Sequence, residues 1–140
     1  MQEKTFFMIK PDGVKRGLEK EIFARIEKAG LKIIFSQNLL MTKDLAEQLY
    51  APHLGKEFYP GLIRFIASGP VAACIVSGEE AVAKVREIMG ATDPRMAASG
   101  TIRGDLKEAE VINKDGIIKN LVHGSDSLES AARELAIFFQ

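Results

Sequence analysis

The sequence predicts an α+β fold: a ferredoxin-like βαββαβ core with an antiparallel four-stranded sheet and helices packed on it. Apolar runs of strand length alternate with segments of helical periodicity, and prolines and glycines separate them. The main segments follow one another as strand, helix, strand, strand, helix, strand. The length of 140 residues and the apolar content of 46% suit a single domain over 1–140.

The first strand and helix have clear boundaries in the sequence. Residues 5–9 form a short apolar run, and the proline and glycine within 10–13 predict a turn after it. Apolar residues then recur at helical spacing over 18–29, and Gly30 ends this amphipathic helix. Residues 31–41 predict the second strand.

Further helices are expected before the third strand. Thr42 can cap a short helix through Tyr50, and residues 60–68, which begin with proline, predict another helix. Residues 51–59 and 91–109 show no clear periodicity and are expected to be irregular. Long irregular segments in a compact domain often carry function, so both are candidates for a site.

The second half of the chain repeats the alternation. Residues 71–76 predict a buried strand, and 79–89 predict a helix with acidic residues in its first turn and a glycine after its last. A further strand is expected over 117–122. Ser125 or Asp126 is expected to cap a final helix that extends nearly to the C-terminus.

Composition excludes several classes of protein. The formal net charge is zero and the pI is about 6.7, so we expect no specific nucleic-acid partner and no membrane partner. Cys74 is the only cysteine and lies in an apolar run, which favours a core position and leaves no disulfide within the chain. No signal-peptide pattern and no apolar stretch of spanning length is seen, so a cytoplasmic protein is expected.

His123 is the first candidate for chemistry. It follows an apolar run and precedes Gly124 at the start of the last predicted helix. A histidine placed there can act as a nucleophile among backbone N–H groups that favour negative charge. A histidine beside Leu121 and Val122 can also be a strand-end residue without chemistry, so the functional interpretation needs partners elsewhere in the chain.

Candidate phosphate-binding cations are spread along the chain. Lys10 ends the first strand, Arg86 lies late in a helix, and Arg103 lies in a tight segment between Gly100 and Gly104. Arginine binds phosphate oxygens through two parallel hydrogen bonds, and lysine supplies a compact charge. Each could equally be a solvated surface charge when taken alone.

A nucleoside would also need a stacking ring and polar partners. Phe58, in the irregular segment before Pro60, could stack on a base of any identity, and Thr92 and Asn120 could supply polar contacts. Phe58 could instead be a core residue.

Several short blocks of this sequence resemble the signature blocks of nucleoside diphosphate kinases, in the same order over nearly the whole chain. His-Gly-Ser-Asp-Ser at 123–127 is the most specific of them, whereas Lys-Pro-Asp-Gly alone would be weak. The blocks are Lys10–Val14, Phe58–Leu62, Ser68–Val71, Gly90–Pro94, Gly100–Asp105 and His123–Ser127. The resemblance implies a phosphotransferase that exchanges terminal phosphoryl groups between nucleoside triphosphates and diphosphates, acting as a homo-oligomer, either a tetramer or a hexamer.

The resemblance also implies roles for individual residues. His123 would become phosphohistidine, with Glu134 and Ser125 holding the non-reacting ring nitrogen and Tyr50 packing nearby. Phe58 would stack on the base. The remaining nucleotide contacts would come from Lys10, Arg86, Thr92, Arg103 and Asn120.

The expected mechanism is ping-pong, from a triphosphate to His123 and then to a diphosphate, with broad base specificity. Such transfer depends mainly on positioning and charge stabilisation. Mg²⁺ would be held largely by nucleotide phosphates and water, with no protein metal ligand assigned, although Asp126 could reach the ion through a water.

Two departures from the family pattern stand out. The segment before Asn120 is longer than usual by roughly seven residues as we align it, and Asn-Lys-Asp-Gly at 113–116 predicts a hairpin turn. We therefore expect an inserted hairpin at about 106–118, which leaves open whether Val111, Ile117 or Ile118 faces the base. The C-terminus is short, so tetramer and hexamer both stay possible.

Other classes of protein are less consistent with the sequence. A non-catalytic nucleotide-binding protein would have little reason to keep His123, Glu134 and the cations together. An RNA-binding ferredoxin-like module usually has a basic face and sheet aromatics, and this chain has zero net charge and no Trp. A histidine phosphatase or a phosphocarrier would release free phosphate or use another acceptor, which turnover with a diphosphate distinguishes.

Overall fold

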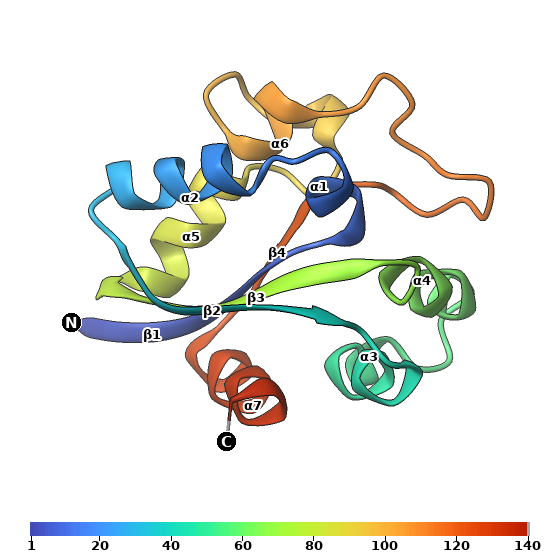
Figure 1. The fold of residues 1–140 in the computed structure, drawn as a ribbon, viewed down its shortest axis with the longest axis horizontal. Coiled ribbons are helices and arrows are strands. Elements are labelled where there is room, and N and C mark those ends of the chain that lie inside the picture. The colour runs from blue at the N-terminus through green and yellow to red at the C-terminus, as the bar shows by residue number, and fades with distance from the viewer. Residues whose placement is uncertain (140) are drawn as a thin grey trace.

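The computed structural model describes residues 1–139 and contains an antiparallel four-stranded sheet with the order β2-β3-β1-β4 (Figure 1). The central strand β1 pairs with β3 along its whole length, from Gln2↔Glu79 to Ile9↔Ala72. The strand bounds are β1 (Gln2–Ile9), β2 (Lys32–Leu40), β3 (Pro70–Glu79) and β4 (Val122–Gly124). The predicted ferredoxin-like α+β fold is confirmed.

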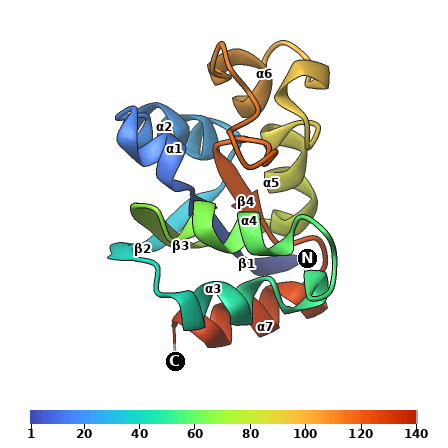
Figure 2. The same cartoon turned by 90° about the vertical axis from the view of Figure 1, so that its right-hand side faces the viewer.

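The longer helices cover both faces of the sheet, as Figures 1 and 2 show together. On one face lie α2 (Glu19–Lys28) and α5 (Ala81–Met89), and on the other lie α3 (Lys43–Leu49), α4 (Tyr59–Ile66) and α7 (Leu128–Phe138). Each face has its own buried cluster because side chains alternate along β1: Phe7 and Ile9 join the first cluster, Phe6 and Met8 the second. The central strands β1 and β3 are therefore buried on both sides, whereas most of the edge strand β2 is exposed.

Segments predicted to be turns or irregular contain short helices. The residues after Lys10 begin α1 (Pro11–Lys15), because proline suits the first position of a helix. The 91–109 segment contains a 3-10 turn (Pro94–Met96) and α6 (Ile102–Leu106), and Thr101 caps α6 through the Gly104 N–H. The prediction of irregular structure over 91–109 was wrong there, because helices this short show no periodicity.

Two helix starts differ from the prediction. The acidic residues expected in the first turn of α5 lie before it: Glu79 ends β3, and Glu80 is the N-cap with a φ of 54°. The hydroxyl of Ser127, rather than Ser125 or Asp126, caps α7 by accepting from the Ser130 N–H at 3.0 Å. Ser125 is buried and bonded elsewhere, which prevents it from capping. The predicted Thr42 cap of α3 is confirmed.

The last strand is much shorter than the predicted 117–122 strand. β4 spans only Val122–Gly124, whereas Ile118 forms an isolated bridge with Ile112. Leu121 separates the two paired regions with a φ of 71°, which is uncommon for a residue with a side chain. The Asp12 carboxylate accepts the Leu121 N–H at 2.9 Å, and the Lys10 N–H donates to the Leu121 carbonyl at 2.8 Å. Residues distant in sequence therefore hold Leu121 in this backbone conformation.

Candidate active site

A cavity of about 370 Å³ opens at one end of the sheet, where β1 and β4 meet the helices of both faces. Most of the predicted site residues line it, although they come from segments far apart in the chain. Those brought together are Lys10, Tyr50, Arg86, Thr92, Arg103, Asn120, His123 and Glu134. Ser125 lies behind Glu134, and Phe58 is not among the lining residues.

His123 projects into this cavity from β4, where it pairs with Met8 of β1. Its Nε2 lies 2.9 Å from Oε1 of Glu134, and its side chain is 17% exposed. The Ser125 hydroxyl donates to the same Glu134 oxygen at 2.7 Å. An ionised Glu134 accepts the Nε2 proton, which leaves the lone pair on Nδ1 of the neutral ring.

The protonation states of this pair suit a nucleophile. Burial lowers the pKa of His123 below its usual value, assisted by the charges of Lys10 and Arg103 and opposed by Glu134. Burial alone would raise the pKa of Glu134, but hydrogen bonds from His123 and Ser125, with the charge of Arg133, leave it lowered. At neutral pH the imidazole is therefore uncharged and the carboxylate ionised.

Cations gather beside His123, and the charge of Asp12 offsets the shifts in their pKa values only in part. Burial and the charge of Arg103 lower the pKa of Lys10 to about 8. Burial and the charge of Arg86 lower the pKa of Arg103 to about 10. Positive groups that weaken each other's protonation are stabilised when an anion binds between them, so the cavity favours an anionic ligand.

Arg103 also ties together the backbone around the site. Its guanidinium donates to the carbonyls of Gly90, Asn120 and Val122 at 3.2, 3.0 and 2.7 Å. Arg86 donates to the Gly124 carbonyl at 3.2 Å, immediately after His123. Both arginines therefore come to the cavity held in fixed orientations.

Asn120 connects three parts of the site. Its Oδ1 accepts from Lys10 Nζ at 2.8 Å, and its Nδ2 donates to the Thr92 carbonyl at 3.0 Å. The side chain is buried, so these contacts fix both Asn120 and the lysine ammonium.

Tyr50 packs against His123 edge-on, with ring centroids 5.9 Å apart. Its hydroxyl is buried and has no hydrogen-bonding partner within the described part of the chain. Burial raises the pKa of Tyr50 above its usual value, so the phenol stays protonated and can donate to a ligand.

Phe58 lies outside the cavity and is 44% exposed. Its ring centroid is 5.4 Å from that of His53, which does line the cavity. Phe58 is therefore a surface aromatic next to the site rather than the core residue that the sequence also allowed.

The sequence did not single out His53, Ser130 or Arg133 as cavity residues, although all three line it. Arg133 donates to the Gln48 carbonyl at 2.9 Å and lies 3.4 Å from Glu134 Oε2. The position of Arg133 beside Glu134 on α7 is the one signal that could have indicated it.

The cavity offers little for a metal held by protein alone. Among residues 1–139, no group of three or more His, Cys, Asp or Glu side chains is placed to bind an ion. Asp126 and Glu134 are the cavity's carboxylates, and the oxygens of Glu134 face His123, Ser125 and Arg133.

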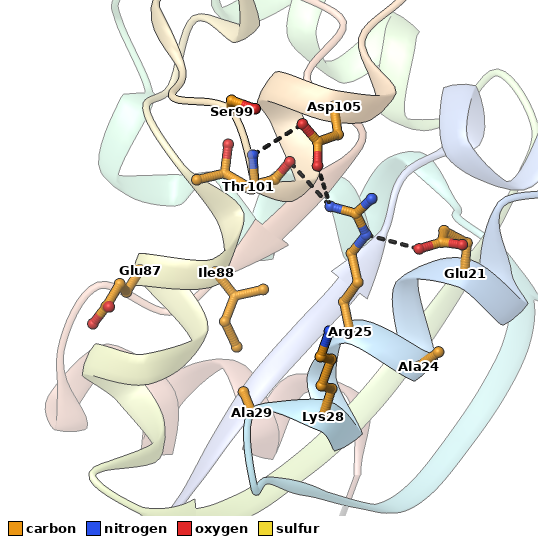
Figure 3. A pocket seen from close by; sticks show the side chains of 11 residues that line it. Glu21, Ala24, Arg25, Lys28, Ala29, Glu87, Ile88, Ser99, Thr101 and Asp105 are labelled. Carbon is orange, nitrogen blue, oxygen red and sulfur yellow. Dashed lines mark hydrogen bonds and ion pairs between the residues drawn. The ribbon is translucent and has the colours of Figure 1, made fainter.

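A larger pocket of about 670 Å³ lies between α2 and the segment leading into α6 (Figure 3). Arg25 crosses it and pairs with Glu21 and Asp105, both at 2.8 Å. Arg25 is thus already paired with both carboxylates beside it, so this pocket is a weaker candidate for chemistry.

The described part of the chain has no candidate for a membrane-spanning helix. Across residues 1–139, no helix has the length and apolar character needed to cross a membrane.

Comparison with known proteins gives a consistent result. The family model described as nucleoside diphosphate kinase matches residues 3–140. A nucleoside diphosphate kinase of Thermus thermophilus is 50% identical over 138 residues, 99% of this chain and 96% of that protein. One from Saccharolobus islandicus is 45% identical over 139 residues, with 99% and 96% covered.

Solved structures agree with the sequence relatives. A halophilic nucleoside diphosphate kinase from Halobacterium salinarum in complex with CDP has a TM-score of 0.89 and 45% identity, covering 100% of this chain and 89% of that one. A transition state mimic of the Borrelia burgdorferi enzyme with vanadate and ADP has a TM-score of 0.91 and 35% identity, covering 99% and 88%.

Proposed function

The chain belongs to the nucleoside diphosphate kinase family, and on that premise we propose that His123 carries the phosphoryl group as a covalent intermediate. The protein is a nucleotide phosphotransferase. The observation that carries the proposal is the contact of His123 Nε2 with Glu134 at 2.9 Å, which leaves Nδ1 free in a cavity lined by cations. Neutral imidazole is the nucleophilic form.

In the first half-reaction, the Nδ1 lone pair attacks the terminal phosphorus of a nucleoside triphosphate. A P–N bond forms, the bond from that phosphorus to the bridging oxygen breaks, and the nucleoside diphosphate leaves with the electron pair. The ring becomes more acidic at Nε2–H during attack, and the adjacent Glu134 carboxylate stabilises the developing positive charge. Ser125 holds the carboxylate in place through its 2.7 Å hydrogen bond.

In the second half-reaction, a terminal phosphate oxygen of another nucleoside diphosphate attacks the same phosphorus. The P–N bond breaks and its electron pair returns to Nδ1, so the enzyme is restored and a triphosphate is released. Both nucleotides use one cavity in turn, which makes the mechanism ping-pong.

The cationic side chains would bind and stabilise the phosphates. Lys10, Arg86 and Arg103 all line the cavity, with Thr92 beside them. Phosphoryl transfer spreads negative charge over the equatorial oxygens, and fixed cations in a confined site stabilise that charge. The protonated Tyr50 hydroxyl would donate to the phosphate in transfer.

The nucleoside would extend from the cavity toward the surface. Phe58 would stack on the base, and Lys10 and Asn120 would contact the sugar hydroxyls. Stacking on an exposed ring does not distinguish one base from another, which supports broad specificity.

Magnesium fits this arrangement as an ion held by the nucleotide. Asp126 is exposed at the cavity and could contact the ion through a water, while Glu134 is already engaged. When bound, the ion supplies positive charge that neutralises phosphate oxygens. The protein's own contribution is to hold the phosphates and present Nδ1.

We extend the proposal to the organisation of the protein. Residues 1–140 would form one kinase domain with an inserted hairpin at about 106–118, in a cytoplasmic homo-oligomer that is a tetramer or a hexamer.

Radiolabelled ATP tests the proposal. The wild-type protein should acquire acid-labile label from the terminal phosphate, and the His123→Ala variant should acquire none. His53→Ala is the matched control, because it removes the other cavity histidine, and it should still be labelled. Equal labelling of His123→Ala and wild type would overturn the assignment.

A further inference from the structure

Arg133 lies between two helices at the edge of the cavity. The helices α3 and α7 pack against each other on one face of the sheet (Figure 2), and Arg133 extends from α7. Its guanidinium donates to the carbonyls of Gln48 and Leu49 at 2.9 and 3.2 Å, and these are the last two residues of α3. The last turn of α3 has no basic residue of its own, so Arg133 supplies the cation that the C-terminus of a helix favours.

The same guanidinium contacts the second carboxylate oxygen of Glu134. Oε1 of Glu134 is engaged by His123 and Ser125. Oε2 lies 3.4 Å from Nη2 of Arg133, and no other donor within residues 1–139 bonds it. Nη2 is also the atom that donates to Leu49. One nitrogen of Arg133 therefore connects the end of α3 to Glu134.

The helix alone would not bring Arg133 and Glu134 together. Consecutive residues of an α-helix project about 100° apart, so their side chains do not normally face each other. Here the carbonyls of α3 hold the Arg133 guanidinium where it reaches the carboxylate. With Oε1 bonded to His123 and Oε2 beside Arg133, the plane of the carboxylate is fixed at both oxygens.

We propose that Arg133 is a positioning residue for His123, which uses the end of α3 to hold the Glu134 carboxylate in the orientation that accepts the Nε2 proton. The inference rests on the role of His123 as phosphoryl carrier in the proposed function. It assigns Arg133 to the rate of the covalent step and not to nucleotide binding. The Arg133 side chain is 38% exposed, so water screens its charge, and its orienting contacts carry the effect.

The first test compares Arg133→Met with Arg64→Met by rapid mixing with a range of ATP concentrations. Arg64 is a matched control: it also lies 3.4 Å from a carboxylate, that of Asp115, but it does not line the cavity. Arg133→Met should lower the limiting rate of His123 phosphorylation about tenfold, since a small misplacement near the reacting atoms can cost on the order of 100-fold. The ATP concentration that gives half of this rate should stay within about twofold.

Two outcomes of this comparison would overturn the inference. The first is a limiting rate in Arg133→Met equal to that of Arg64→Met, which should itself match the wild type. The second is an unchanged limiting rate with a higher half-saturating ATP concentration. That result would mean that Arg133, which lines the cavity, binds phosphate directly.

A donor without a nucleoside tests whether the effect lies at His123. Phosphoramidate should phosphorylate Arg133→Met about tenfold more slowly than the wild type, because the change acts on the imidazole whatever the donor. Equal rates would place the effect on the nucleotide and overturn the inference. Arg133→Lys keeps a charged donor but not the fork that reaches both α3 and Glu134, so its rate should fall between those of Arg133→Met and the wild type. Thermal melts establish that each variant is folded at the assay temperature.

A double-mutant cycle separates positioning through Glu134 from general loosening of the protein. In a Glu134→Ala background there is no carboxylate to orient, so adding Arg133→Met should slow phosphorylation by less than about twofold. A further tenfold loss in that background would show that Arg133 acts independently of Glu134 and would overturn the inference.

His123→Ala distinguishes failure of this inference from failure of the proposed function. If His123→Ala is still labelled by ATP, the phosphoryl carrier is wrong and the inference falls with it. If His123→Ala is unlabelled and Arg133→Met behaves like Arg64→Met, only the positioning role is overturned.

Discussion

Glu134 reaches across from α7 to His123 on β4, and its carboxylate oxygen lies 2.9 Å from the imidazole Nε2. Their separation of eleven residues is bridged by the turn after β4 and the first turns of α7. The side chain of Glu134 is 6% exposed, so water does not weaken the contact. This pairing selects which nitrogen of the proposed nucleophile carries the lone pair.

Replacing Glu134 by Gln should therefore slow phosphorylation of His123 on the order of a hundredfold. The amide is neutral and can donate to Nε2, which would favour the wrong tautomer and remove stabilising charge. Stopped-flow labelling with excess ATP measures the step directly. Glu129→Gln, on the exposed first turn of the same helix, should react at the wild-type rate. A Glu134→Gln variant as fast as Glu129→Gln would contradict the tautomer argument.

The value of kcat/KM should decrease as the pH is lowered, and the midpoint of this decrease should lie below pH 6.5. The protonated imidazole has no lone pair to attack phosphorus, and burial lowers the pKa of His123 in the free enzyme, so activity persists as the pH drops through 6.5. Initial rates from pH 4.5 to 7.5 measure the midpoint. A midpoint above 6.5 would show that Glu134 outweighs burial.

Nucleotide affinity should weaken as the pH rises through about 8, where the buried Lys10 loses its charge in the free enzyme. Below that pH the ammonium is present and can bind phosphate. Lys10→Ala should raise the KM about 10- to 100-fold near neutral pH. The variant should also lose the increase in KM that the wild type shows above about pH 8, because the titrating group is gone. If the KM of Lys10→Ala still increases at alkaline pH, the titration belongs to another group.

Asp12 should be a determinant of stability through Leu121. Asp12→Ala would leave the buried Leu121 N–H without its 2.9 Å acceptor and should lower the free energy of unfolding by about 1–3 kcal/mol. Asp12→Asn keeps an acceptor oxygen and should cost less. Urea denaturation of the three proteins gives the comparison, and equal losses from Ala and Asn would rule out the hydrogen bond as the cause.

Much of the fold could be predicted from the sequence, because the patterns that indicate its helices and strands depend on neighbouring residues. The helical spacing before Gly30, the Thr42 cap and the apolar runs of β1 and β3 all reflect neighbouring residues, and the structure has these elements as predicted. The last strand of the sheet was harder to predict. The 117–122 strand is interrupted at Leu121 by its bonds to Lys10 and Asp12, which are distant in sequence.

The site followed a similar division. His123, Lys10 and Arg103 stand in short blocks with recognisable residues, whereas Arg86 lies outside them. Spacing alone could not choose Glu134 over Glu129, and only the family resemblance pointed to Glu134. His53 and Arg133 lie at the cavity because of how α3 and α7 pack on the sheet, and neither stands in a block with a local signal. The predicted cap of α7 at Ser125 or Asp126 was wrong for the same reason: the Ser125 hydroxyl donates to Glu134, a contact that depends on how the chain folds.

The most direct test of the proposed mechanism follows one phosphate through both half-reactions. The protein is exposed to ATP, freed of nucleotide, and analysed by mass spectrometry for a phosphate on the peptide containing His123. Added GDP should remove that phosphate and yield GTP in equal amount. Formation of GTP without prior phosphorylation of His123, or release of the phosphate as inorganic phosphate in place of GTP, would contradict the covalent mechanism.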